Sequence, residues 1–118
     1  MNEKNLAESR RQEVRRRRLA ARLARLGPIL VGTITARTIE ADDPAHPGQK
    51  KTYGPYYQWT YKEAGKTITR NLTAAQATVY QRAIDNHRAL TEIVAELRAL
   101  SLAVLEQTTP GVVKRSRR

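Results

Sequence analysis

The feature that most constrains this fold is residues 73–107, a run that contains neither glycine nor proline. It opens with "TAAQ" at Thr73–Gln76, which has the spacing of a helix capping box. The sequence therefore predicts a helix from Ala74 to Gln107, about 50 Å long at 1.5 Å per residue. Such a helix is longer than a small sheet can cover, so its second half needs another apolar surface.

An apolar seam runs along the second half of this predicted helix. Its members alternate at spacings of three and four residues, the a/d pattern of a coiled coil. They are Leu90, Ile93, Leu97, Leu100 and Val104. Two surfaces could bury this seam, namely a helix formed by the N-terminus of the same chain or a second copy of the protein.

The first 27 residues are predicted to form a basic helix. Asn5 and Glu8 fit the spacing of an N-cap, and Gly27-Pro28 supplies a stop. One sector of the helix is apolar and consists of Leu19, Leu23 and Leu26. The neighbouring sector carries an arginine stripe, whose members lie within about 80° of one another at 100° per residue. These are Arg11, Arg15, Arg18, Arg22 and Arg25.

The net charge of +11 is concentrated at the two ends of the chain. Residues 1–26 hold nine basic and three acidic residues, and residues 107–118 hold four basic residues and no acid. Cationic ends attract polyanions at long range, which makes nucleic acid the expected partner, with DNA preferred over RNA. The expected contact residues are Arg11, Arg15, Arg16, Arg17, Arg18, Arg22, Arg25, Lys50, Lys51, Lys62, Lys66, Arg70, Lys114 and Arg115.

The middle of the chain predicts a small antiparallel sheet of three strands. Residues 29–40 are rich in Ile, Val and Thr and form the first expected strand. Residues 41–55 contain three prolines and two glycines and are expected to form a loop. Residues 56–62 and 66–72 are the other two strands, joined by a tight turn that contains Gly65.

The register of this hairpin decides what its aromatic residues do. A two-residue loop pairs Glu63 with Lys66 and Trp59 with Arg70, which gives one apolar face and one polar face. A three-residue loop moves the aromatics to the polar face, because one residue of slip exchanges the faces. Apolar patterning favours the first register. In the second, three rings could stack on unpaired bases, those of Tyr57, Trp59 and Tyr61.

The stretch "GPYYQWTYKEAGKTITRNLT", residues 54–73, resembles a family of small uncharacterised bacterial proteins often encoded within or beside transposable elements. The resemblance implies a mobile-element context and no particular reaction. The family usually carries a cysteine cluster before this motif, whereas this chain has no cysteine. The matching residues are Gly54, Pro55, Tyr56, Tyr57, Gly65, Lys66, Thr67, Gln76, Tyr80, Ile84, Asn86 and Arg88.

No pattern of catalytic or metal-binding residues is present in the sequence. His46 and His87 are far apart and neither has a second histidine one helical turn away. There is no phosphate-binding or dinucleotide-binding fingerprint and no apolar run of about 20 residues. We therefore expect a cytoplasmic, non-enzymatic protein without metal or cofactor.

These observations predict an α+β chain in three parts. Residues 1–27 form the basic helix, residues 28–107 the sheet and long helix, and residues 108–118 a disordered basic tail. The leading hypothesis is a DNA-binding accessory or regulatory protein of a bacterial mobile element. One alternative is an interaction module that dimerises, or docks on a transposase-like partner, through the long helix. Another is RNA or single-strand binding by the aromatic strand.

Overall fold

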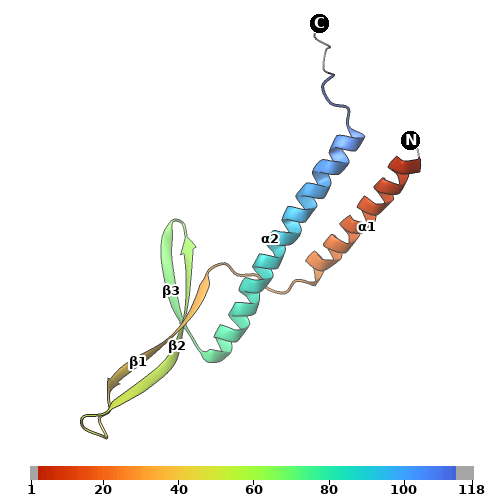
Figure 1. The fold of residues 1–118 in the computed structure, drawn as a ribbon. Coiled ribbons are helices and arrows are strands. Elements are labelled where there is room, and N and C mark those ends of the chain that lie inside the picture. Colours follow the sequence, from red (N-terminus) through yellow and green to blue (C-terminus); the bar gives the residue numbers. More distant parts are fainter. Residues whose placement is uncertain (1–2, 114–118) are drawn as a thin grey trace. The chain divides into compact units, whose positions relative to one another are not determined.

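The computed structural model describes residues 3–113 and has the predicted α+β layout (Figure 1). A helix, three strands and a second helix follow one another along the chain. They are α1 (Glu3–Arg25), β1 (Thr33–Asp42), β2 (Lys50–Glu63), β3 (Lys66–Leu72) and α2 (Ala74–Thr108). The long helix was predicted to within one residue at each end.

The chain divides into two compact units. The sheet unit is Gly27–Arg88 and contains the three strands and the start of α2. The helical unit combines α1 with the part of α2 from Ala89 onward. The long helix thus contributes to both units, whereas the sequence analysis placed it wholly with the sheet.

The sheet is antiparallel with strand order β1-β2-β3. The loop predicted over residues 41–55 is shorter in the structure and covers residues 43–49, because the pairing of β1 with β2 extends to Asp42 opposite Lys50. Pro55 lacks a backbone N–H and cannot donate a hydrogen bond to the neighbouring strand. The pairing register shifts between Arg37 and Ile39, and this bulge falls at the proline, so that β2 can include it. The first strand also begins at Thr33 rather than at residue 29.

The hairpin has the two-residue loop, so the three-residue alternative is wrong. Glu63 pairs with Lys66 and Trp59 with Arg70. Ala64 and Gly65 have φ angles of 50° and 80°, the two positive values that a type I′ turn requires. Alanine is unusual at the first of these positions. The two-residue loop sets the register that places Tyr57, Trp59 and Tyr61 on the face with Ile68 and Leu72.

Trp59 is the centre of the sheet-unit core, with 8% of its surface exposed. Its ring stacks on Tyr61 with a centroid distance of 4.1 Å and meets the edge of Tyr80 at 5.5 Å. Its indole N–H donates to the carbonyl of Val31 over 2.9 Å. A side chain at Gly32 would lie 2.5 Å from the carbonyl oxygen of Thr60, so only glycine lets the chain pass this close.

Hydrogen bonds fix α2 to the segment that precedes β1. The backbone N–H of Leu30 donates to the carbonyl of Ala83, and the side-chain amide of Asn86 donates to the carbonyl of Pro28.

The capping box predicted at the start of α2 is confirmed, with both of its hydrogen bonds present. Thr73 N–H donates to Gln76 Oε1 over 2.9 Å, and Gln76 N–H donates to Thr73 Oγ1 over 3.1 Å.

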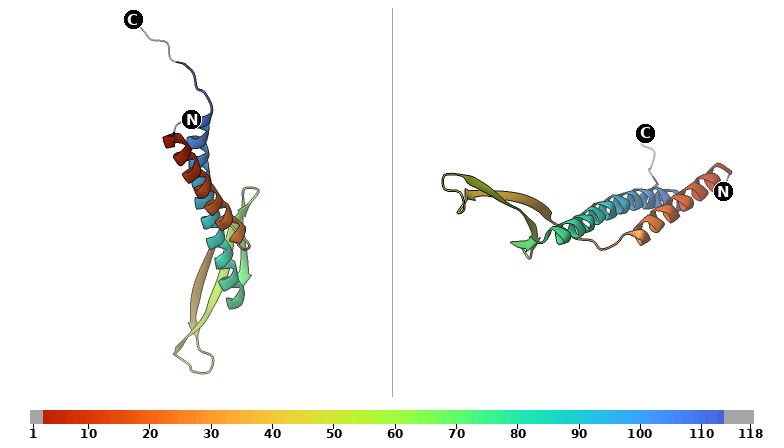
Figure 2. Two further views of the ribbon diagram at one scale, coloured as in Figure 1. Left: turned by 90° about the vertical axis from the view of Figure 1, so that its right-hand side faces the viewer. Right: turned by 90° about the horizontal axis from the view of Figure 1, so that it is seen from below.

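In the helical unit, α1 and the C-terminal part of α2 lie side by side and run in opposite directions (Figure 1 and Figure 2). Two apolar residues are buried among its described residues, Leu19 at 3% exposure and Ile93 at 1%. The rest of the seam is only half-buried, and Leu23 remains exposed. The chain's own N-terminal helix therefore covers the seam in part.

Candidate nucleic-acid interface

One flank of the helical unit is hollowed into a groove rich in arginine, which we call the arginine groove. Its walls also include Val14 and Leu19 from α1 and Glu96 from α2. The arginines that line it are Arg10, Arg11, Arg15, Arg18 and Arg22. Four of the five predicted stripe residues therefore share one concave surface, and Arg25 continues the same helix sector beyond it.

Glu96 is the one acidic residue that lines this groove within the described chain. Its Oε2 atom lies 3.7 Å from Arg15 Nη2 and 3.9 Å from Arg22 Nη1. All three side chains are solvent-accessible, so these long ion pairs stabilise the fold little. Within residues 3–113, no carboxylate reaches ion-pair distance of Arg11 or Arg18. The groove thus retains a large excess of positive charge.

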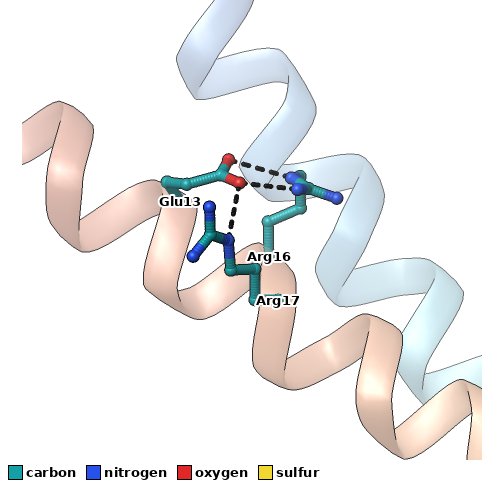
Figure 3. Close-up of polar contacts among 3 residues, drawn as sticks. All are labelled: Glu13, Arg16 and Arg17. Carbon is teal, nitrogen blue, oxygen red and sulfur yellow. Dashed lines mark hydrogen bonds and ion pairs between the residues drawn. The ribbon is translucent and has the colours of Figure 1, made fainter.

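Arg16 and Arg17 have a different environment, although they were predicted with the same set. Both donate to the carboxylate of Glu13 (Figure 3). Arg16 forms a fork, with its Nη2 2.6 Å from Oε1 and its Nε 2.9 Å from Oε2. The hydrogen bond from Arg16, assisted by the one from Arg17, lowers the pKa of Glu13 to about 2, and the same contact raises the pKa of Arg16. These two cations therefore share one compensating charge.

The basic residues of the sheet unit are scattered over it. Lys50 pairs with Asp42 over 2.8 Å, and Lys51 lies 5.5 Å from the ring centroid of Tyr53. Arg70 pairs with Trp59 across the hairpin, and its guanidinium lies over the ring of Tyr61 at 5.7 Å.

The last predicted cations lie at the hairpin turn or outside the described chain. Lys62 and Lys66 are both exposed beside the turn that joins β2 to β3. Lys114 and Arg115 lie outside the described residues 3–113.

The sheet face that carries Gln58 is polar. Gln58 Nε2 donates to Asn71 Oδ1 over 3.2 Å, and the hydroxyl groups of Thr60 and Thr69 lie 3.2 Å apart. Both pairs join residues directly opposite on β2 and β3. Because alternate residues share a face, this surface includes Thr33, Thr35, Arg37, Tyr56, Gln58, Thr60, Lys62, Thr67, Thr69 and Asn71.

Sequence reasoning did not single out Arg37, although the structure places it on this polar face. Arg37 is opposite Tyr56 in the ladder and lines a shallow pocket with Gln58 and Asn71. The alternation of β1 would have indicated its face, but only once the partner strand was known. The predicted stacking residues are elsewhere, since Trp59 is buried and the rings of Tyr57 and Tyr61 are half-buried on the opposite face.

Two further findings concern chemistry and membranes. Among residues 3–113, no three His, Cys, Asp or Glu side chains gather in a way that could hold a metal ion. His46 Nδ1 lies 3.0 Å from Asp43 Oδ2 within the loop between β1 and β2. Neither described helix has an apolar stretch long enough to cross a bilayer.

The family model for Domain of unknown function (DUF6788) matches residues 9–81. The chain belongs to this family. Searches of curated proteins and of solved structures each gave no match. The DUF6788 match spans the arginine stripe, the whole sheet and the start of α2, but it ends before the seam that begins at Leu90.

Proposed function

We propose that this DUF6788 protein binds duplex DNA without catalysing a reaction, and that the arginine groove supplies its phosphate contacts. The observation that carries the proposal is the groove itself, in which five arginines meet a single described carboxylate. Guanidinium groups suit this role because their donors form two parallel hydrogen bonds to a phosphate.

The length of the stripe favours a polymer over a small anion. From Arg11 to Arg25 the helix axis rises about 21 Å at 1.5 Å per residue. Duplex DNA presents about 12 phosphates over that distance, since it carries one charge per 1.7 Å. A single phosphate or carboxylate ligand would engage only one or two of the arginines, whereas a nucleic-acid backbone can engage all of them.

Glu96 acts as an internal competitor in this proposal. Its carboxylate lies between Arg15 and Arg22 at distances longer than a hydrogen bond. A phosphate that forms short contacts with both arginines would displace it at small cost, because exposed ion pairs are worth less than about 1 kcal/mol. Replacing Glu96 by glutamine should therefore strengthen binding.

The polar sheet face offers a second contact surface. Its glutamine and asparagine side chains are held by a cross-strand hydrogen bond, and both residue types can pair with adenine. Strands of this kind can enter the major groove as a ribbon. We propose that the face beside Arg37 contributes local readout, whereas the arginines of α1 supply most of the affinity.

The biological setting proposed is a bacterial mobile element, with the protein acting in the cytoplasm as an accessory or regulator. The resemblance of the "GPYY" and "GKT" segments supports this setting. A transposase-like protein would be a natural partner there.

Salt dependence of DNA binding tests the proposal. Each phosphate contact contributes about 0.9 to the slope of log K against log salt on duplex DNA. The double variant R11Q/R18Q should lower the slope by about 1.8, because both arginines lack an ion-pair partner within the described chain. The matched control is R16Q/R17Q, which removes the same formal charge from two cations that share the carboxylate of Glu13.

Three outcomes distinguish the alternatives. A larger slope change in R11Q/R18Q than in R16Q/R17Q supports the arginine groove as the phosphate site. Equal changes would indicate unspecific charge attraction and contradict the role of the groove. Tighter binding of single-stranded than of duplex oligonucleotides would favour the alternative of RNA or single-strand recognition.

A further inference from the structure

The C-terminal part of α2 contains a segment without any charge. Residues 99–105, "ALSLAVL", cover every side of the helix over about two turns. A helix segment that is apolar all round is normally buried on all sides. Here α1 is the one described neighbour in the same unit, and Leu102 and Leu105 are each 58% exposed. The side that faces away from α1 therefore lacks a partner within residues 3–113.

A second groove lies on the other flank of the helical unit, and we call it the apolar groove. Leu97, Leu100, Val104 and Leu105 supply its apolar wall on α2. Neutral or paired side chains complete it, namely Ser9, Gln12, Glu13, Arg16, Ser101 and Thr108. Leu102 continues this apolar surface, since it lies about 60° around the helix from Leu105.

The charges around this groove favour a second copy of the chain as its occupant. The described residues that line it include only two charged side chains, Glu13 and Arg16, which carry opposite charges and are joined by two hydrogen bonds. Glu13 lies about 140° around α1 from Arg18, so the arginine groove faces elsewhere. Two copies can thus join through their apolar grooves without bringing their unpaired arginines together.

The size of the surface matches what a dimer requires. The helical unit uses about 20 residues of α2, or about 30 Å of helix, and two helices side by side are about 20 Å across. A face of this size would bury about 600 Å² on each copy and about 1,200 Å² in total, the lower end of the range for stable interfaces. Leu6, exposed on α1, lies on the same flank and would extend it.

We propose that the apolar groove and the adjoining residue Leu102 pack against the same surface of a second copy, forming a four-helix dimer. A two-fold contact suits the site, because one self-complementary surface then serves both copies. The dimer does not depend on nucleic acid. The arginine groove of each copy stays accessible in it, so the two activities can be tested separately.

The mass of the full chain in solution tests the dimer. Nuclease-treated protein at about 100 μM should have close to twice the monomer mass of 13.4 kDa, since a dimer with a Kd of about 1 μM is about nine-tenths formed there. Association should strengthen between about 0.1 M and 0.5 M salt, because salt screens the repulsion between two chains that each carry +11. DNA binding should show the opposite dependence on salt.

Variants locate the contact. Leu105→Glu should yield a monomer, because it places a charge in the proposed interface at a position already exposed in the single chain. Leu102→Glu is a second variant with the same expected result. The matched control is Val79→Glu, which changes a residue of α2 that is 57% exposed but lies in the sheet unit, and it should remain dimeric. A wild-type chain of 13.4 kDa at both salt concentrations would overturn the proposal, as would a dimer that both leucine variants leave intact.

Discussion

In the sheet unit, short hydrogen bonds of fixed geometry join segments far apart in the chain, whereas in the helical unit two long ion pairs join α1 to α2. Trp59 donates to Val31 over 2.9 Å and Asn86 donates to Pro28 over 2.9 Å. By contrast, both Arg15 and Arg22 lie more than 3.5 Å from the carboxylate of Glu96.

This difference in polar contacts indicates that the two units have different roles. Directed hydrogen bonds around a buried indole specify one arrangement and are little affected by salt. Exposed charges are screened by salt and exchange partners readily. The sheet unit therefore suits a scaffold that presents a defined polar face, and the helical unit suits a surface completed by a polyanion or a second copy.

Removing the indole should have the largest effect on stability. Trp59→Ala should lower the free energy of unfolding of the sheet unit by about 3–5 kcal/mol, because it leaves a cavity at the centre of the core. Amide hydrogen exchange in β2 and β3 measures the loss. Tyr56→Ala is the control on the same strand, where the ring is exposed and the change should stay within about 0.5 kcal/mol. Similar losses in both variants would argue against a core centred on Trp59.

The cap of α2 should have an intermediate effect. Thr73→Ala removes the hydroxyl that accepts from Gln76 N–H and should cost about 1 kcal/mol. Urea unfolding followed by far-ultraviolet circular dichroism measures it. Thr78→Ala serves as control, because its hydroxyl only donates back to the carbonyl of Ala74 within the helix, and alanine is the better helix former there. A loss at Thr78 as large as at Thr73 would contradict this role of the cap.

The smallest expected effect on stability is the loss, at acid pH, of the contact between Glu13 and Arg16 in the helical unit. The pKa of Glu13 falls from its ordinary value of 4.5 to about 2 in the folded chain. Its carboxylate therefore stabilises α1 above pH 4.5, and this contribution is lost as the pH falls from about 4.5 to about 2. The carboxyl carbon shift of Glu13 in an NMR titration measures its pKa. Arg16→Gln should return that pKa toward 4.5, and a wild-type midpoint near 4.5 would show that the fork does not form.

Local patterns in the sequence predicted much of the fold. The capping box gave the start of α2, and the separation of polar from apolar residues gave the register of the hairpin. The extension of β2 to Lys50 was not predicted, because the bulge that admits Pro55 depends on pairing with β1. Composition alone favoured a loop at that point.

The candidate interface was predictable only in part. The arginine stripe follows from helical periodicity. Glu13 and Arg16 are three residues apart, a spacing that places them side by side on a helix, but counting charges alone did not reveal this pair. Glu96 carries no such signal. It lies more than 70 residues from Arg22 in sequence, and only the packing of α2 on α1 brings them together.

The aromatic cluster around Trp59 also makes the two units optically distinct. All six aromatic residues of the chain lie between Tyr53 and Tyr80, inside the sheet unit, and the helical unit has no aromatic ring. Intrinsic fluorescence and near-ultraviolet dichroism therefore come from the sheet unit alone. An unlabelled sample therefore reports on the structure of the sheet unit directly. Changes confined to the helical unit should leave both signals unaltered.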